Sequence, residues 1–367
     1  MNIALITPGF SAHPDDWAIP ALQNLARCLA QRHTLHLFSL RYPAVGVYRF
    51  DGLTHHAIGG GQRFGAASLK CWLDAARAVI RQHRRAPFHL LHAFWADEAG
   101  FSAALAGALI GRPVIVSIGG GELTRLPGIH YGAQRFLARR LTTRLALRRA
   151  RLVTAGSGYQ LNLCRAHGLA AGKLRPAPLG IDTDRFTPPA APPAAPVLVQ
   201  AASLLPVKNQ ARLLHLLAAV KQRLPAVSLR LAGDGPLQAE LRQLAQQLDV
   251  SHNVTWAGAL PYPAMPHFFR QGTLYLQSSR HESQGMAVLE ALACGLPAIG
   301  TPVGLLPEVG AASNVDGELV GRIVNQLDNQ TDYANASAKA RALAVQQYSL
   351  PVTTARFEQL YEMVNDE

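Results

Sequence analysis

Charged residues are scarce in this chain, and negatively charged ones are the scarcer kind. Only 16% of the 367 residues are charged, whereas 49% are hydrophobic. This composition excludes an intrinsically disordered chain, because such chains combine few apolar residues with many charges. The length and the apolar content instead predict a globular protein with enough core-forming material for two domains.

Cysteine is also rare. The four residues Cys28, Cys71, Cys164 and Cys294 are scattered, and no two of them have the close spacing that a zinc site or a redox motif needs. Four free thiols fit a reducing compartment, so we expect a cytoplasmic protein. The first residues, MNIALITPGF, carry no basic residue before the apolar run and soon reach Pro8 and Gly9, so no signal peptide is expected there.

An uninterrupted membrane-spanning run is missing as well. Residues 101–118 contain enough apolar residues to suggest one, because a spanning helix needs about 18. Arg112 and Pro113 interrupt this stretch in the middle. We therefore expect a buried helix over residues 102–110 and a buried parallel strand over 113–118.

Positive charge is present in excess and is unevenly distributed. The net charge is +12, and residues 1–190 carry 23 Lys and Arg against 9 Asp and Glu, whereas residues 191–367 carry 12 against 14. A basic half can attract anionic lipid, acidic glycan or nucleic acid, and charge alone does not choose among them. No nucleic-acid recognition motif accompanies the charge, so we do not expect a nucleic-acid partner.

Strand-like and helix-like segments alternate along the chain, which is typical of doubly wound α/β sheets. The expected strands cover residues 3–7, 35–40, 53–58, 89–93, 113–118, 152–155, 197–201, 227–232, 254–257, 274–276 and 318–320. A Pro- and Ala-rich segment, PPAAPPAAP, has the composition of a stiff, extended linker. The sequence thus predicts α/β domains at residues 1–187 and 197–348, a linker at 188–196 and a C-terminal segment at 349–367.

One strand–loop–helix stretch has the features of an anion site. An apolar strand at 274–276 is followed by a polar loop, 278–285, and by a helical segment. The first N–H groups of a helix are unpaired and its dipole favours an anion, so the start of this helix can bind a phosphate. Gly285 lets the backbone approach the phosphate, and Met286 and Ala287 would donate their N–H groups.

Two glutamates flank this anion site. Glu282 lies just before it, and Glu290 lies about one turn into the helix. An ionised carboxylate only accepts hydrogen bonds, and its paired oxygens suit the vicinal hydroxyls of a sugar. The loop therefore predicts a phosphate with a polyol on each side, which describes a nucleotide-sugar. On a simpler interpretation, Glu282 caps the helix and Glu290 is solvated.

At these residues the sequence resembles the retaining glycosyltransferases of family 4, whose signature is two glutamates separated by seven residues. Glu282 and Glu290 have that spacing within HESQGMAVLEALACGLPAIGT, and Gly304 and Glu308 follow. The resemblance implies the GT-B fold, in which two Rossmann-like domains face one another across a cleft and the last helix crosses back onto the first domain. It also implies that Glu290 binds the ribose of the donor and Glu282 the hydroxyls of the sugar.

The resemblance extends to the loop at residues 203–209. Family members usually have an arginine and a lysine flanking this loop, and both pair with the phosphates of the donor. Lys208 stands at the lysine position, whereas Ser203 stands where the arginine would be. The resemblance therefore implies that Lys208 acts with Glu282 in catalysis, and that part of the phosphate binding shifts to backbone N–H groups and Arg280.

A glycine-rich loop in the first half also resembles a ligand-binding loop of the family. Three successive glycines after the strand at 113–118 let a ligand approach the backbone, so we predict that Gly119 and Gly120 contact the donor. Family members generally have a histidine at the position of Gly119, and it touches the transferred sugar. That contribution is either absent here or comes from His13 or His92.

The loop after the first strand, residues 8–17, occupies the place of the family's glycine-rich loop but lacks its paired glycines. We predict that it shapes the acceptor site instead. The predicted acceptor residues are His13, Trp17 and His92.

The densest charge run, RFLARRLTTRLALRRAR, extends from Arg135 to Arg151. On a helix, four arginines fall on one side, with leucines offset from them: Arg140, Arg144, Arg148 and Arg151. One interpretation is a cationic face on an anionic membrane surface, which would make the protein peripheral on the cytoplasmic face of the membrane. The other is a solvated arginine-rich face.

Together these motifs predict a retaining glycosyltransferase that moves a sugar from a nucleotide-sugar to a glycan or lipid-linked acceptor. No cofactor and no metal ion are expected, because Asp182 and Asp184 favour a turn paired with Arg185 over a metal-binding Asp-x-Asp. Two alternatives stay open: a GT-B-type sugar-nucleotide epimerase and a non-catalytic nucleotide-sugar-binding protein. The second is motivated by Gly119 and Ser203, where the chain departs from the family.

Overall fold

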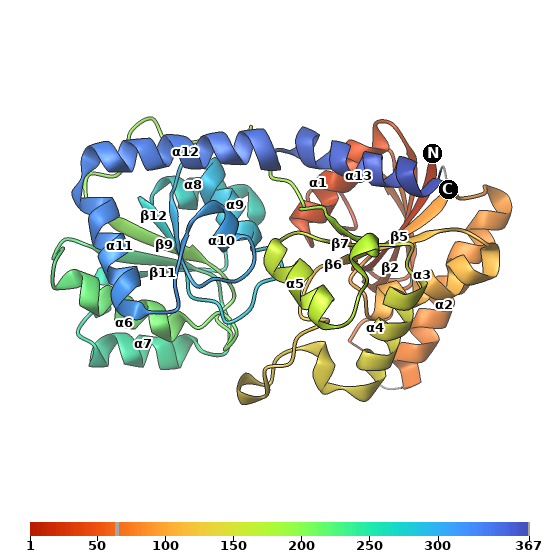
Figure 1. Ribbon diagram of the computed structural model, residues 1–367, viewed down its shortest axis with the longest axis horizontal. Coiled ribbons are helices and arrows are strands. Elements are labelled where there is room, and N and C mark those ends of the chain that lie inside the picture. The colour runs from red at the N-terminus through yellow and green to blue at the C-terminus, as the bar shows by residue number, and fades with distance from the viewer. Residues whose placement is uncertain (63–65, 366–367) are drawn as a thin grey trace. The chain divides into compact units, whose positions relative to one another are not determined.

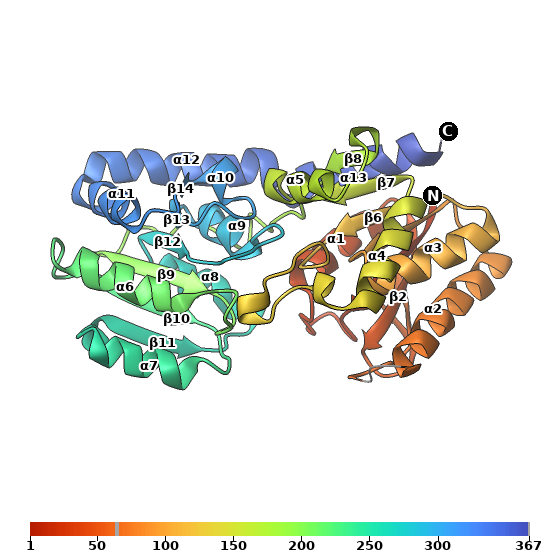
Figure 2. The ribbon, with the colours of Figure 1, turned by 60° about the horizontal axis from the view of Figure 1, so that its bottom comes forward.

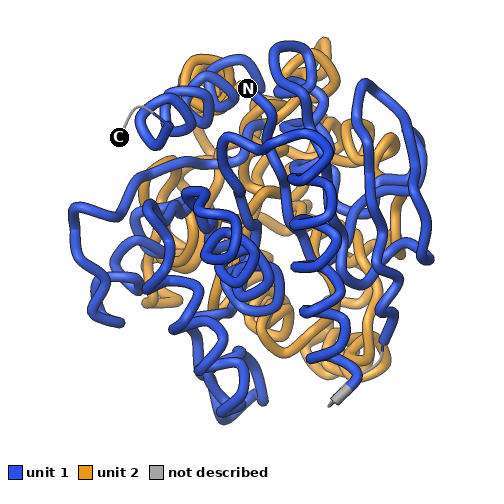
Figure 3. Tube along the Cα trace, turned by 90° about the vertical axis from the view of Figure 1, so that its right-hand side faces the viewer, with its two compact units in different colours: residues 1–180, 350–367 blue, residues 181–349 orange. Residues whose placement is uncertain are grey.

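The computed structural model describes residues 1–62 and 66–365. Its contacts divide the chain into two compact units (Figure 3): unit 1 is Met1–Gly180 with Leu350–Glu367, and unit 2 is Ile181–Ser349. The division falls before the predicted boundary at residue 187, and the predicted linker lies within unit 2. Arg341 of unit 2 accounts for this, because its guanidinium donates to the carbonyl oxygens of Thr183 (2.9 Å) and Phe186 (2.6 Å).

Unit 1 is an eight-stranded sheet (Figure 1) in the order β3-β4-β2-β1-β5-β6-β7-β8. Its strands are β1 (Asn2–Gly9), β2 (Thr34–Tyr42), β3 (Gly46–Phe50), β4 (Leu53–Ala57), β5 (Leu90–Phe94), β6 (Val114–Ile118), β7 (Leu152–Ala155) and β8 (Leu174–Pro176). Every pair is parallel except β3 with β4, which is antiparallel. The ligand-binding edge of such a sheet is the one where the parallel strands end.

Helices cover both faces of this sheet. They are α1 (Pro20–Ala30), α2 (Ala66–Arg85), α3 (Glu98–Ile110), α4 (Leu137–Arg149), α5 (Gly158–Ala166) and α13 (Leu350–Asn365). One core joins the sheet to α2 and α3 through side chains such as Val79 and Ala103. A second core, on the other face, includes Leu25 of α1 and Phe357 of α13. This doubly wound arrangement is the one that the sequence predicts.

Unit 2 is a six-stranded, fully parallel sheet in the order β11-β10-β9-β12-β13-β14, of which Figure 2 shows β9 to β12 side by side. The strands are β9 (Val197–Ala201), β10 (Ser228–Ala232), β11 (Val254–Gly258), β12 (Leu274–Gln277), β13 (Ala298–Gly300) and β14 (Ala311–Ala312). The helices are α6 (Gln210–Lys221), α7 (Gln238–Gln247), α8 (Met265–Arg270), α9 (Met286–Ala293), α10 (Leu306–Val309), α11 (Asp316–Asp328) and α12 (Gln330–Tyr348). Both units therefore have the predicted α/β class.

One predicted strand is wrong. Residues 318–320 belong to α11, which begins with two acidic residues, Asp316 and Glu318, in its first turn. Acidic side chains are favourable at a helix start. Leu319 and Ile323 then lie four residues apart and both pack into the core of unit 2, so this stretch follows the period of a helix.

Candidate functional site

The candidate site in unit 2 is built from two loops that leave the sheet side by side. Strands β9 and β12 are parallel neighbours, so the loops after them start at the same edge. The Arg280 N–H donates to the carbonyl of Val207 at 2.8 Å, and the Ser278 hydroxyl donates to the carbonyl of Lys208 at 2.7 Å. These bonds join the two loops, although their residues are about 70 positions apart in the sequence.

Lys208 and Glu282 meet where these loops join. The Lys208 Nζ lies 2.6 Å from the Glu282 Oε1, and the Ser279 hydroxyl donates to the same oxygen at 2.7 Å. The side chain of Lys208 is 25% exposed and that of Glu282 is 15% exposed, so a ligand can reach both. The structure therefore pairs the two residues that the sequence predicts to be catalytic.

The start of α9 is open to an anion. Gly285 precedes the helix with φ of 89°, in the left-handed region that favours glycine. The N–H groups of Met286 and Ala287 find no hydrogen-bond acceptor within the described part of the chain, whereas the N–H of Val288 donates to the carbonyl of Gly285. Two unpaired N–H groups at the positive end of a helix dipole are suited to bind a phosphate.

Gly304 lets the segment after β13 lie close to the loop that precedes α9. The Leu305 N–H donates to the carbonyl of Gln284 at 2.8 Å. A Cβ on Gly304 would lie 2.6 Å from that carbonyl oxygen and 2.8 Å from the Cβ of Glu282, and its φ is 62°. Only glycine lets the segment after β13 approach Glu282 so closely.

Glu290 lies one turn along α9 from this helix start. Burial raises the pKa of its carboxyl group to about 7, and the group has no ion-pair or hydrogen-bond partner among the residues that the structure describes. Burial, and then the nearby carboxylates of Glu282 and Glu290, raise the pKa of the Tyr275 hydroxyl. Both carboxylates thus lie near Tyr275 on β12, and Glu290 is left available to a ligand.

Ser203 contributes no cation to the site. It is exposed, and its carbonyl accepts the Gln210 Nε2 at 3.0 Å. The guanidinium of Arg280 is also exposed and has no partner in the described part of the chain. Arg280 is therefore free to supply the positive charge that Ser203 lacks, while the predicted role of Ser203 in donor binding stays a prediction.

The glycine-rich loop of unit 1 differs from the predicted donor-binding loop. The buried Glu122 accepts the N–H of Gly119 at 3.0 Å through Oε1 and the N–H of Gly120 at 2.6 Å through Oε2. Its Oε1 also accepts the N–H of Ala96 at 3.2 Å. The carboxyl group of Glu122 therefore accepts these N–H groups within the chain, and the predicted contact of Gly119 and Gly120 with the donor stays a prediction.

Gly119 has a further neighbour that sequence reasoning missed. A Cβ at this position would lie 2.8 Å from the indole ring of Trp95, so the ring fills the space of a side chain at residue 119. The aromatic Trp95, directly after β5, was the only signal for this contact. It explains why glycine stands where family members have histidine.

The prediction that His92 contacts the acceptor is wrong. Its ring is fully buried between the Tyr361 hydroxyl and the Ser117 hydroxyl, each 2.8 Å away, and burial lowers its pKa to about 3. It is a core histidine that no acceptor reaches. His13 is exposed, and Trp17 lies under the guanidinium of Arg27, 4.8 Å from the ring centroid. The acceptor roles of His13 and Trp17 stay predictions.

Two family models together match most of the chain. The model for Glycosyltransferase Family 4 matches residues 21–185, and the model for Glycosyl transferases group 1 matches residues 183–340. The chain belongs to glycosyltransferase family 4. The second match contains the whole site of unit 2, from Ser203 to Glu290.

Curated relatives agree with this family. A GDP-mannose-dependent alpha-(1-6)-phosphatidylinositol monomannoside mannosyltransferase of Mycolicibacterium smegmatis is 31% identical over 187 residues, 45% of this chain and 49% of the relative. An N-acetyl-alpha-D-glucosaminyl L-malate synthase of Bacillus anthracis is 31% identical over 142 residues, 36% of this chain and 36% of the relative. The matches thus span about half or less of these relatives' length.

Solved structures of the same architecture cover the whole chain. A sucrose-phosphate synthase from Thermosynechococcus elongatus superimposes with a TM-score of 0.80, at 18% identity and over 99% of both chains. An Anabaena protein solved in complex with UDP-glucose superimposes with a TM-score of 0.75, at 19% identity and over 99% of this chain and 100% of that one. At this identity the likeness shows the fold, which is GT-B.

The Asp-x-Asp sequence of this family 4 chain forms a turn. The Asp182 Oδ1 accepts the N–H groups of Asp184 at 3.1 Å and Arg185 at 3.0 Å, and the Arg185 Nε lies 3.6 Å from the Asp182 Oδ2. Within residues 1–62 and 66–365, no three His, Cys, Asp or Glu side chains are grouped to share a metal ion. The turn that the sequence predicts is therefore present.

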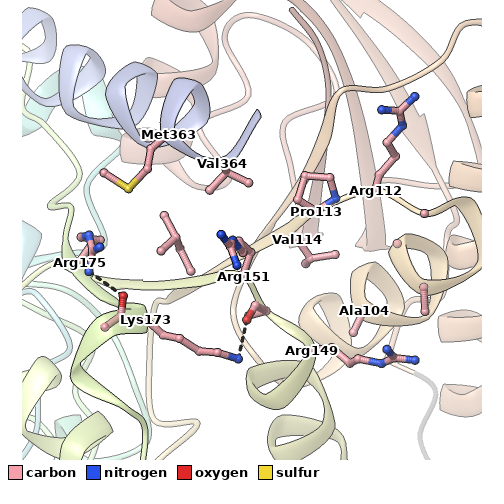
Figure 4. A pocket seen from close by; sticks show the side chains of 16 residues that line it. Ala104, Arg112, Pro113, Val114, Arg149, Arg151, Lys173, Arg175, Met363 and Val364 are labelled. Atoms are coloured by element: carbon pink, nitrogen blue, oxygen red, sulfur yellow. Dashed lines mark hydrogen bonds between the residues drawn. The ribbon is translucent and has the colours of Figure 1, made fainter. Parts of the chain in front are cut away.

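A basic cavity of about 640 Å³ lies in unit 1, beside the amino ends of β6 and β7 (Figure 4). The cationic residues that line it are Arg112, Arg149, Arg151, Lys173 and Arg175. The Lys173 Nζ donates to the carbonyls of Arg148 and Ala150 at 3.0 Å each, at the end of α4 where a helix dipole favours a cation. Part of the positive charge of the first half therefore stabilises a helix end at the sheet edge opposite the family's ligand loops.

In the part of the chain that the structure describes, no helix is both long enough and apolar enough to cross a membrane.

Proposed function

We propose that this protein transfers a sugar, with retention of configuration and without a metal ion, from a nucleotide-sugar to a glycan or lipid-linked acceptor. The observation that carries the proposal is the Lys208–Glu282 pair beside the open start of α9. A cation, two free N–H groups and a carboxylate lie together there, as binding of a diphosphate joined to a sugar requires. The names of the relatives support the same class, since they include a GDP-mannose-dependent enzyme and a protein bound to UDP-glucose.

Each side chain has one role in this proposal. Lys208 and the N–H groups of Met286 and Ala287 bind the diphosphate, Glu290 binds the ribose hydroxyls, and Glu282 binds the hydroxyls of the sugar. Departure of the nucleoside diphosphate builds negative charge on the leaving phosphate. Donors that are already fixed in place stabilise that charge without reorganising. A hydroxyl of the acceptor then attacks the anomeric carbon on the face that the leaving group vacates and gives its proton to the departing phosphate, which retains the configuration.

The test begins with a thermal-shift screen of the full chain against UDP-, GDP- and ADP-sugars. A ligand at 100 times its dissociation constant stabilises the folded state by about 2.7 kcal/mol, so the correct donor should raise the midpoint clearly. The Glu282→Gln and Lys208→Met variants should lose this shift. Glu240→Gln and Lys339→Met, exposed residues of unit 2, serve as matched controls and should keep it.

Product analysis with the donor found in that screen then separates the alternatives. Transfer to an added glycan or lipid supports the transferase. A changed sugar-nucleotide with donor alone would identify an epimerase. Donor binding without hydrolysis, transfer or conversion would identify a non-catalytic binding protein, and absence of any donor binding would overturn the proposal.

We further propose that α4 rests on an anionic membrane surface, as a peripheral protein on the cytoplasmic face. The apolar side chains of Leu137, Leu141 and Leu145 are 78%, 57% and 40% exposed on this helix. Arg140 and Arg144, which are exposed beside them, can pair with lipid phosphates while the leucines enter the acyl region.

Flotation with vesicles tests this membrane contact. Binding to vesicles that contain phosphatidylglycerol should be lost in a Leu141→Glu, Arg144→Glu variant and should weaken as salt is raised. Leu109→Glu, a 68% exposed leucine on α3, is the matched control. Absence of flotation of the wild type on vesicles with the anionic lipid would argue for a solvated arginine-rich face.

A further inference from the structure

The basic cavity of unit 1 lies at the edge of the sheet where β6 and β7 begin (Figure 4). Its wall is formed by the first residues of these strands, the ends of α3 and α4, the segment that leads into β8 and the last turn of α13. The glycine-rich loop after β6 leaves the sheet at the opposite, carboxyl edge, where ligands bind in doubly wound folds. The cavity is therefore separate from the edge that serves the proposed transfer.

The wall of this cavity carries positive charge without a matching negative charge. Five arginine and lysine side chains line it, and no aspartate or glutamate is among its lining residues within 1–62 and 66–365. Figure 4 shows Arg151 in the middle, with Arg175 and Lys173 to one side and Arg112 and Arg149 to the other. Like charges that line one cavity repel one another, so an anion that binds among them is stabilised.

Internal hydrogen bonds use two of these cations but do not neutralise them. The Lys173 Nζ donates to two carbonyls at the end of α4, and the Arg175 Nη1 donates to the carbonyls of Gly172 and Leu174 at 2.9 Å each. Carbonyl oxygens carry no net charge, so both side chains still attract an anion.

Two further guanidinium groups have no internal acceptor. The side chains of Arg112 and Arg149 are exposed, and neither donates to a residue that the structure describes. The end of α3 does not need the Arg112 side chain as a cap, because the backbone N–H groups of Gly111 and Arg112 already donate to the carbonyl of Gly107. A guanidinium group presents its donors in a planar fork that matches the oxygens of a phosphate.

The rest of the wall is apolar and leaves room for more than a phosphate ion. Ala104, Gly107 and Ala108 of α3 line it, as do Met363 and Val364 of α13, and Met363 is 41% exposed. The volume of about 640 Å³ lies within the range of small-molecule sites, about 300–1,000 Å³. An anionic group can therefore bind together with an organic body.

We propose that this cavity binds an organic phosphate, with the phosphate paired to the cationic side chains and the organic body against Met363. Both a soluble phosphate ester and the headgroup of an anionic lipid have this chemistry. A phosphate monoester suits the wall better than a carboxylate, because it carries close to two negative charges and three acceptor oxygens. The proposed sugar transfer uses none of these residues, so this is a second ligand site.

Calorimetric titration of the full chain at low salt tests the site with two probes. Glycerol 3-phosphate represents a soluble ester, and dihexanoyl phosphatidic acid, kept below its micelle concentration, represents a lipid headgroup. At least one probe should bind the wild type. Binding should weaken about 10-fold or more in an Arg112→Gln, Arg149→Gln variant, which removes two charged partners, and it should weaken as salt is raised.

The two probes also identify the source of the phosphate. Tighter binding of the lipid probe, reduced in Met363→Gln, would assign the site to a lipid headgroup, because the acyl chains would then contact the apolar wall. Binding of glycerol 3-phosphate that is as tight or tighter would assign it to a soluble ester.

Matched controls separate this site from the proposed function and from general charge. Arg223→Gln, Arg322→Gln changes two exposed arginines of unit 2 and should leave binding unchanged. Lys208→Met should also leave it unchanged, so failure of the donor screen would not affect this titration. Binding of neither probe, wild-type affinity in the Arg112→Gln, Arg149→Gln variant, or an equal loss in either control would overturn the site.

Discussion

The two units share one architecture, yet the loops at their strand ends are occupied in opposite ways. In unit 2 the N–H groups of Met286 and Ala287 have no acceptor among the residues that the structure describes, and Lys208 pairs with Glu282 just before them. In unit 1 the N–H groups of Gly119 and Gly120 are taken by the carboxylate of Glu122, three and two residues further along the chain. A glycine-rich strand end therefore offers N–H donors, but it does not show whether their acceptor is a ligand or a side chain of the protein.

The largest effect is expected in unit 2, where the polar groups of the site are proposed to bind an external ligand. We expect Lys208→Ala or Glu282→Ala to lower kcat by about 10²- to 10³-fold, the effect of removing one preorganised charge partner. Release of nucleoside diphosphate measures it, with the exposed Glu240→Ala as control. Wild-type kcat in both site variants would show that the pair is structural.

In unit 1 the corresponding change should destabilise the fold. Glu122→Ala leaves the N–H groups of Ala96, Gly119 and Gly120 without their acceptor, and that of Ala96 is buried. An unsatisfied buried donor costs about 1–3 kcal/mol, so we expect a loss of about 1–3 kcal/mol in the free energy of unfolding, chiefly from Ala96. Denaturant titration measures this loss. A loss confined to activity, with stability unchanged, would mean that Glu122 belongs to the reaction.

Glu122 should also make stability depend on pH. Burial, followed by the charge of Asp97, raises the pKa of its carboxyl group from 4.5 to about 7. Between these values the folded state keeps a proton that the unfolded state has released, so stability is full below pH 4.5 and falls as pH rises toward 7. A shift of this size corresponds to at most about 3 kcal/mol, and we expect a loss of about 2.

Chemical denaturation at several pH values measures this slope, and Glu122→Ala should flatten it. A slope that is the same in the variant would assign the titration to another group, of which Glu290, with its raised pKa, is the first candidate.

The smallest expected effects come from two glycines, one in each unit. Gly119→Ala forces a Cβ against the Trp95 ring at 2.8 Å, and Gly304→Ala places one 2.6 Å from the backbone carbonyl of Gln284. Overpacking costs about 1–3 kcal/mol, and Gly304 should be the more sensitive because backbone moves less readily than a ring. Thermal unfolding of the two variants gives the order, and a larger loss at Gly119 would mean that Trp95 is the more rigid partner.

The sequence alone determined the features that depend on neighbours along the chain. The alternation of strands and helices, the helix start at Gly285 and the spacing of Glu282 and Glu290 all lie within short segments. Their geometry follows from local backbone rules, and the family resemblance rests on the same segments.

Tertiary structure alone decided which distant groups meet. Lys208 and Glu282 form a pair although they are 74 residues apart in the sequence. His92 is buried against Tyr361, which is 269 residues away. The packing of Trp95 over Gly119 likewise joins different segments. So do the hydrogen bonds that Arg341 donates to the segment at residues 181–187. No local sequence pattern predicts such contacts. The secondary-structure propensity of each partner depends on its own segment, and only the folded core brings the two partners together.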